Sequence, residues 1–176
     1  MKLAGVDGDA ADGARIKIRF QKPSGFDYET NPIQITHVGN GVYEATIVFG
    51  SAVPWLPLGN DYAMYIKGEK HISRKFCQAT GQTTRCTGNG KISIFSTSET
   101  RTFDFTGLVL EPGDLLSQDG VANASDFAKI TSLLSKSCSA LTDNDKLTAD
   151  LDYSGCVNIR DALMMRRTLE TKYDED

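Results

Sequence analysis

One stretch of the chain decides how its fold is interpreted: Asp150-Leu151-Asp152-Tyr153-Ser154-Gly155-Cys156-Val157-Asn158-Ile159-Arg160-Asp161. Oxygen-bearing side chains stand at its positions one, three, five, nine and twelve, and a glycine, which permits a sharp turn, stands at position six. A hard cation such as Ca²⁺ takes about six to eight oxygen ligands, which a loop of this length supplies by wrapping around the ion. The stretch therefore predicts a calcium loop in which Asp161 replaces the usual final glutamate.

The residues after this loop predict a helix. Apolar residues recur at helical spacing in residues 162–169, and few residues there disfavour a helix. Residues 146–149, just before Asp150, are too few to indicate one. We therefore expect an EF-hand-type loop-helix unit whose first helix is missing or shortened.

A second copy of the unit lies upstream, at residues 114–126, and a further helical pattern follows it at residues 127–134. The segment from Asp119 to Asn123 aligns with the segment from Ser154 to Asn158, and Asp126 aligns with Asp161, which makes an internal repeat.

The first copy contains an insertion of one residue before its glycine. Its first ligand is therefore open among Asp114, Ser117 and Gln118. The second loop is the more secure site.

We expect metal ligands in both loops. The candidates of the second loop are Asp150, Asp152, Ser154, Cys156, Asn158 and Asp161. The candidates of the first loop are Asp114, Ser117, Asp119, Val121, Asn123 and Asp126. Such residues also cap helices and form turns without a metal. Two matching loops in tandem favour calcium, which supplies folding energy that a small module lacks.

Paired loop-helix units of this kind resemble a dockerin over residues 112–172. The resemblance implies a small all-α module that binds calcium and docks onto a cohesin in extracellular assemblies. It also implies a partner-binding role for Arg166 and Arg167, which stand where dockerins usually carry a basic pair. Thr131 and Ser132 stand at the corresponding place of the first repeat, which argues against symmetric two-way docking.

Residues 1–110 predict β-structure instead. In residues 14–20, Ile16, Ile18 and Phe20 alternate with charged residues, which is typical of a half-buried strand. Further strands are predicted at residues 33–38, 42–49, 61–67, 73–77 and 100–105. Asn40-Gly41 predicts a hairpin because both residues tolerate positive φ.

Short strands separated by Gly, Asn and Pro predict an antiparallel β-sandwich. Their order over residues 14–80 resembles prealbumin-like or Cna B-type sandwiches of surface proteins. The predicted fold class is therefore two domains. An antiparallel β-sandwich spans residues 1–110, and an all-α, dockerin-like pair of EF-hand-type loop-helix units spans residues 111–176.

The four cysteines fall into two local pairs, Cys77 with Cys86 and Cys138 with Cys156. Three pairings are formally possible, and local disulfides need no contact between the halves. The alternatives are a zinc site or free thiols, although no CxxC spacing is present. An even number of cysteines together with calcium loops indicates an extracellular or cell-surface location.

Three other features have both a functional and a structural interpretation. The acidic residues of segment 7–13 would bind a further calcium or form a solvated turn. The basic residues Lys67, Lys70, His71, Arg74 and Lys75 would meet an anionic glycan or an acidic partner, although a solvated strand face is the preferred interpretation. Trp55 would stack on a sugar or pack on the rim of the sandwich.

Composition excludes several classes of function. The chain has 176 residues, a net charge of -4, and 40% hydrophobic and 24% charged residues, which argues against disorder and nucleic-acid binding. It contains no apolar run of membrane-spanning length and no signal-peptide core after Met1, so we expect a processed chain or a segment of a longer protein. Motifs such as HExxH and GxSxG are absent, and we expect no enzyme.

The sequence thus predicts an extracellular, non-catalytic calcium-binding protein for assembly or adhesion at the cell surface, such as a subunit of a filament or surface layer. Its partner would be another copy of the chain. Two alternatives stay open: a C-terminal tail that docks a secreted protein onto a cohesin-like receptor, and a carbohydrate-binding sandwich with a dockerin-like anchor.

Overall fold

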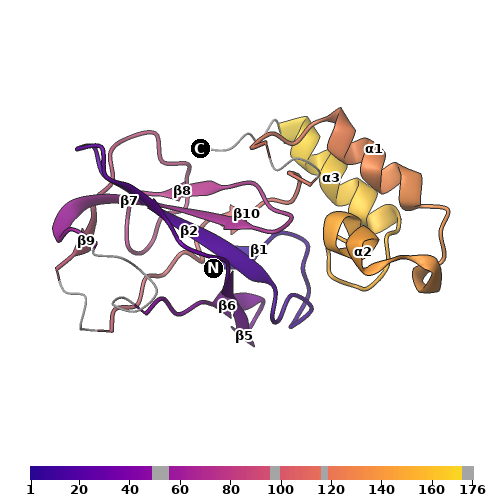
Figure 1. The fold of residues 1–176 in the computed structure, drawn as a ribbon, viewed down its shortest axis with the longest axis horizontal. Coiled ribbons are helices and arrows are strands. Elements are labelled where there is room, and N and C mark those ends of the chain that lie inside the picture. The colour runs from indigo at the N-terminus through magenta and orange to yellow at the C-terminus, as the bar shows by residue number, and fades with distance from the viewer. Residues whose placement is uncertain (49–55, 96–99, 116–118, 172–176) are drawn as a thin grey trace.

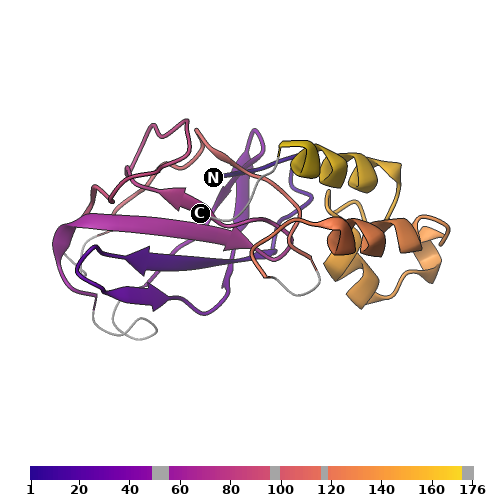
Figure 2. The same cartoon turned by 90° about the horizontal axis from the view of Figure 1, so that it is seen from above.

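A computed structural model describes residues 1–48, 56–95, 100–115 and 119–171. Within these residues, two β-sheets lie at one end of an elongated molecule and the α-helices gather at the other end (Figure 1). The view from above shows the same separation (Figure 2).

The smaller sheet has four short strands in the order β10-β1-β6-β5. Their bounds are Val109–Leu110 for β10, Lys2–Leu3 for β1, Val42–Glu44 for β6 and Thr36–Gly39 for β5. β1 and β10 pair in parallel, and the other pairs are antiparallel. Asn40 and Gly41 both have positive φ, 53° and 66°, in the turn between β5 and β6, which confirms the predicted hairpin.

The larger sheet is antiparallel and contains six strands. Its main order is β3 (Asp27–Glu29), β2 (Arg15–Gln21), β7 (Gly59–Gly68) and β8 (Arg74–Phe76), while β4 (Ile33–Gln34) also pairs with β2 and β9 (Ile92–Ile94) with β7. Ile16, Ile18 and Phe20 are buried in β2, as their alternation predicts.

Residues from both sheets share one hydrophobic core. Leu3, Tyr43 and Leu110 of the smaller sheet belong to the same buried cluster as Phe20 and Ile66 of the larger sheet. A separate apolar cluster holds the helical end together. It consists of Leu115, Ile130, Leu133, Leu141, Ala149, Leu151, Val157, Ala162 and Met165.

The helices begin at side chains that cap them. α1 (Ala124–Leu133) starts at Asn123, and α2 (Asp143–Ala149) starts at Thr142, each with a capping box completed by an aspartate three residues later. A 3₁₀ turn, η1 (Cys138–Ala140), separates them. α3 (Ile159–Thr171) follows the second predicted calcium loop.

This architecture corrects the predicted fold class. An antiparallel β-sandwich followed by an all-α, dockerin-like pair of EF-hand-type loop-helix units is wrong. In the part of the chain that the structure describes, β-structure predominates, one strand pair is parallel, and three short helices form no clear pair. A short helix, α2, does precede Asp150, which agrees with a shortened first helix and not with a missing one. α2 has only seven residues, too few to show a helical period in the sequence.

Two predicted strands are corrected as well. Residues 100–105 form no strand, and the strand predicted at 42–49 ends at Glu44 within the described residues. Phe103 and Phe105 instead use their aromatic rings to cover the shared core. Trp55 lies outside the described residues.

Both predicted disulfides are present. Cys77 bonds to Cys86 and Cys138 bonds to Cys156, and no cysteine is free. Within the described part of the chain, every helix is too short or too polar to cross a membrane.

Candidate metal site

Three aspartates of the second predicted loop meet in a buried cluster. One carboxylate oxygen from each of Asp150, Asp152 and Asp161 lies within 4.8 Å of the other two. These residues are only 4%, 5% and 0% exposed. Burying even one unpaired carboxylate is costly, so three at this separation need a positive charge among them to stay ionised.

Two helices and the backbone of the loop position these carboxylates. Asp150 is the C-cap of α2, and its carboxylate accepts a hydrogen bond from the Gly155 N–H at 2.8 Å. Asp161 lies in the first turn of α3 and accepts from the N–H groups of Leu151 and Asn158 at 2.7 and 2.8 Å. Gly155 has a φ of 83°, the left-handed region that favours glycine, so its place in the sequence has a structural reason.

Burial makes the charged form of this cluster unfavourable. It raises the pKa of Asp150 and of Asp161 above the usual value for an aspartate. The hydrogen bonds from the loop N–H groups lower both pKa values, and the charge of Asp152 raises that of Asp161 further. A bound cation would offset the burial cost that these hydrogen bonds leave.

The basic side chains near the loop compensate only part of the charge. The Nε atom of Arg160 lies 3.2 Å from a carboxylate oxygen of Asp152. Lys70 reaches the loop as well, but its Nζ donates to the main-chain oxygen of Asp150. Among the described residues, no Lys or Arg side chain forms a hydrogen bond or ion pair with the carboxylates of Asp150 or Asp161.

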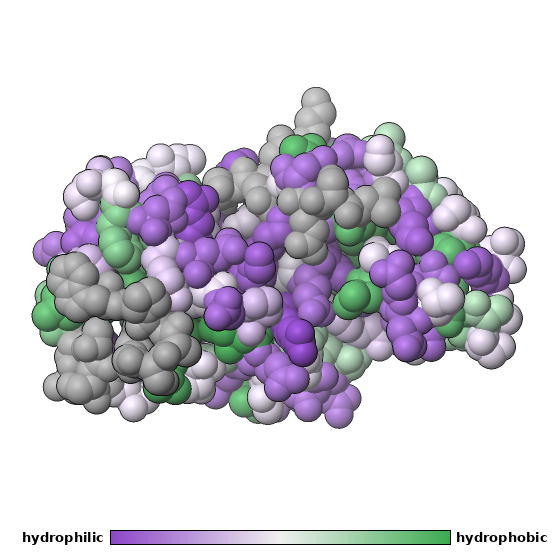
Figure 3. Space-filling view, viewed as in Figure 1, coloured by the Kyte–Doolittle hydropathy of each residue, from purple (hydrophilic) through white to green (hydrophobic). Residues whose placement is uncertain are grey.

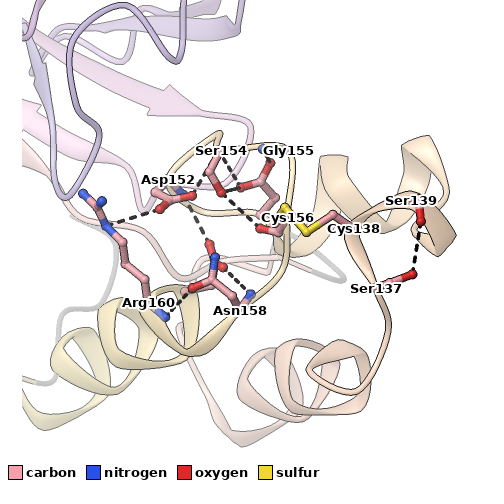
Figure 4. Close-up of a disulfide and its surroundings, with 11 residues drawn as sticks. Ser137, Cys138, Ser139, Asp152, Ser154, Gly155, Cys156, Asn158 and Arg160 are labelled. Atoms are coloured by element: carbon pink, nitrogen blue, oxygen red, sulfur yellow. Dashed lines mark hydrogen bonds and ion pairs between the residues drawn. A yellow bond between two sulfur atoms is a disulfide. The ribbon is translucent and has the colours of Figure 1, made fainter.

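Three further candidates lie at the same loop (Figure 4). The Ser154 hydroxyl lies 3.4 Å from a carboxylate oxygen of Asp150 and 3.3 Å from the Cys156 carbonyl oxygen. The Asn158 side chain accepts from the Arg160 N–H at 2.8 Å, so it caps α3. The Cys138–Cys156 disulfide ties η1 to the loop, with 4.7 Å between the two Cα atoms.

The segment between β7 and β8 covers this loop from the sheet end of the molecule. The Lys70 Nζ lies 3.8 Å from the ring centre of Tyr153, and the His71 ring stacks on the same tyrosine with centres 6.3 Å apart. Lys70, His71 and Arg74 are buried, so the preferred interpretation of this basic run as a solvated strand face is wrong. The sequence does not indicate the contact of Lys70 and His71 with the second loop, because the two segments lie far apart along the chain.

The acidic segment 7–13 meets groups of the protein itself. Asp7 pairs with Arg160, whose guanidinium also donates to the Gly5 carbonyl oxygen at 3.0 Å. Asp12 accepts from the N–H of His37 at 2.8 Å. Arg160 therefore links the N-terminal segment to the second loop, a contact that the sequence did not indicate.

The first loop repeats the hydrogen-bond frame of the second. Asp114 accepts from the Gly120 N–H at 3.1 Å, as Asp150 does from Gly155. Asp126 accepts from the N–H groups of Leu115 and Asn123, both at 2.9 Å, as Asp161 does from Leu151 and Asn158. In its hydrogen bonds Asp114 is thus the counterpart of Asp150.

The other described candidate ligands of the first loop do not gather in one buried cluster as those of the second loop do. Asp119 and Val121 are exposed, and the Asn123 side chain caps α1. Ser117 and Gln118 lie outside the described residues. Among the described residues, the first loop yields no cluster of three carboxylates like that of the second loop.

The predicted partner-binding arginines are neighbours on α3, and both reach solvent. Arg166 is exposed and pairs with Glu170 one turn later, with 2.7 Å between Nε and Oε1. Arg167 is also exposed. Ile159 and Leu163 are 66% and 54% exposed on this helix.

Comparisons of the chain with protein-family models, with curated proteins and with solved structures found no match. The resemblances to dockerins and to prealbumin-like or Cna B-type sandwiches therefore stay predictions.

Proposed function

We propose that the chain is an extracellular, calcium-binding, non-catalytic protein that serves assembly or adhesion at the cell surface. The observation that carries this proposal is the buried cluster of Asp150, Asp152 and Asp161. Its carboxylates converge from the end of α2, the loop and the start of α3.

The donor atoms favour calcium over other metals. All the candidate ligands offer oxygen, which hard cations prefer, and a flexible loop suits the variable coordination of calcium better than the strict octahedron of magnesium. Structural zinc uses thiolate and imidazole ligands, but all four cysteines are in disulfides and the cluster contains no histidine. Bound calcium would neutralise the carboxylates and fix the loop between α2 and α3.

Two disulfides support an extracellular location. Disulfides persist in oxidising compartments, where calcium is also abundant. The Cys138–Cys156 bond closes part of the proposed calcium loop, so the metal and the disulfide would stabilise the same segment.

The exposed side of α3 supports a role in assembly. Ile159, Leu163 and Arg166 follow one another at spacings of four and three residues, which places them on one side of the helix. The face seen in Figure 3 is mostly hydrophilic with scattered apolar residues. The proposed role of calcium is to hold the start of α3 so that this side meets a neighbouring copy of the chain.

The test compares particle size in calcium and in a chelator by sedimentation and electron microscopy at high protein concentration. We expect ordered oligomers or filaments in calcium and their loss with the chelator. Leu163→Glu on α3 should prevent assembly, whereas Leu147→Glu, at a similarly exposed position of α2, is the matched control and should not. A chain that stays monomeric in calcium would contradict the assembly proposal.

A further inference from the structure

The first loop has the frame of a cation site, but a lysine lies on its first carboxylate. The side chain of Lys67, at the end of β7, extends to Asp114 and forms an ion pair with it. The side chain of Asp114 is 0% exposed and that of Lys67 is 17% exposed. The pair is therefore shielded from solvent.

The position of the Lys67 ammonium group is informative because the two loops have the same pattern of internal hydrogen bonds. The carboxylate oxygen of Asp114 that contacts Lys67 also accepts a hydrogen bond from the Gly120 N–H. Its counterpart Asp150 accepts from Gly155 in the same way. Lys70 donates to the main-chain oxygen of Asp150, so its charge acts on the Asp150 carboxylate without a direct ion pair. A cationic side chain is thus paired with the first carboxylate in the first loop and not in the second.

Charge compensation gives this difference a physical meaning. A buried carboxylate must be paired with a cation or bind a metal to remain ionised. Lys67 supplies that positive charge to Asp114 from within the chain. A calcium ion at the same carboxylate would face repulsion from the ammonium group at short range.

We propose that the Lys67 ammonium group takes the place of a metal ion in the first loop. The chain then binds one calcium ion, in the second loop. In the first loop, Lys67 of β7 stays paired with Asp114 at any calcium concentration. The number of bound calcium ions, one, rests on the second-loop site proposed above. The role of Lys67 in the first loop does not depend on that site.

The test is a count of bound calcium ions by calorimetric titration and native mass spectrometry of the full chain after chelation. We expect one ion for the wild type and one for Lys67→Arg, which keeps the charge. Lys67→Met removes the charge but keeps most of the stem, and should add a second, weaker ion. Adding Asp114→Asn to Lys67→Met should abolish that second ion.

Lys17→Met is the matched control. Lys17 lies opposite Lys67 in register on β2, but it pairs with Glu29 at the surface, so its loss should leave one ion. Asp150→Ala/Asp152→Ala in the wild-type background removes two ligands of the second loop and should leave no ion, because the first loop takes none. This last variant tests the proposal even if Lys67→Met does not fold.

The outcomes separate this proposal from the calcium proposal. Two ions in the wild type, one remaining ion in Asp150→Ala/Asp152→Ala, or a folded Lys67→Met that still binds one ion would each overturn the role of Lys67. No ion in the wild type would overturn the second-loop site alone. In that case, one ion gained by Lys67→Met would still support the role of Lys67.

Discussion

At the scale of single residues, His71 shows how closely the two ends of the molecule are joined. Its ring is fully buried, stacks on Tyr153 of the second loop, and has no hydrogen-bond partner for either ring nitrogen among the described residues. Burial, together with the nearby charge of Lys70, lowers the pKa of His71 to about 3. The folded protein therefore holds this imidazole neutral.

We expect the free energy of unfolding to decrease as the pH is lowered, because His71 stays neutral in the folded protein. An unfolded histidine takes up a proton below about pH 6.5, and the folded one resists until about pH 3. In this window the free energy of unfolding should decrease by up to about 1.4 kcal/mol per pH unit from His71 alone. Urea unfolding in excess calcium at pH 7, 6, 5 and 4 measures the slope. His71→Phe should have a shallower slope, and an equal slope in both proteins would show that His71 is not the cause.

At the scale of elements, the second loop is held by its flanking helices and by a disulfide. Cys138 and Cys156 are 18 residues apart and enclose α2, so their bond restricts the segment that carries Asp150 and Asp152. The other disulfide, between Cys77 and Cys86, lies in the sheet end of the molecule.

Removal of the loop disulfide should weaken both stability and calcium binding. In the chain-entropy model, a disulfide that closes a loop of this size contributes about 3 kcal/mol. We expect Cys138→Ser/Cys156→Ser to lose stability of this order in urea unfolding and to bind calcium more weakly in calorimetry. Cys77→Ser/Cys86→Ser is the control and should bind calcium as the wild type does. Equal calcium affinities in all three proteins would contradict the proposed link between the disulfide and the loop.

The elements that the sequence predicted well are those with a complete local pattern. β2 alternates over its whole length, and the Asn40-Gly41 turn needs only two residues. The sequence left open whether the helix before Asp150 is missing or shortened, although Thr142 and Asp145 form a capping box, because capping residues also occur in turns. Residues 100–105 alternate as a strand does, yet they form no strand; instead, the rings of Phe103 and Phe105 stack on each other. The frame of the second loop was predicted, but Lys67 and Lys70 approach the loops only after folding.

At the scale of the whole molecule, the segment from β7 to β8 connects both loops to the sheets. Lys67 pairs with Asp114, Lys70 bonds to Asp150, and a backbone bridge joins His71 to Pro112. At the helical end, Thr168 donates to the Pro112 carbonyl oxygen at 2.7 Å. Calcium binding in the second loop should therefore also stabilise the segment between β7 and β8 at the sheet end.

Hydrogen exchange measured by mass spectrometry tests this connection. We expect calcium to slow exchange in residues 150–158 and also in residues 69–73, because the latter pack on Tyr153 and on the backbone of Asp150. β3, on the opposite edge of the larger sheet, should exchange at the same rate with and without calcium. Protection confined to residues 150–158 would show that the two ends respond independently.

Thermal unfolding of the full chain in calcium and in a chelator tests the calcium site most directly. A ligand that binds only the folded state adds about 2.7 kcal/mol when its free concentration is about 100 times its Kd, so the midpoint should rise in calcium. Asp150→Ala/Asp152→Ala removes two of the three buried carboxylates and should abolish most of this rise. A wild-type midpoint that is the same in calcium and in chelator would contradict the central claim.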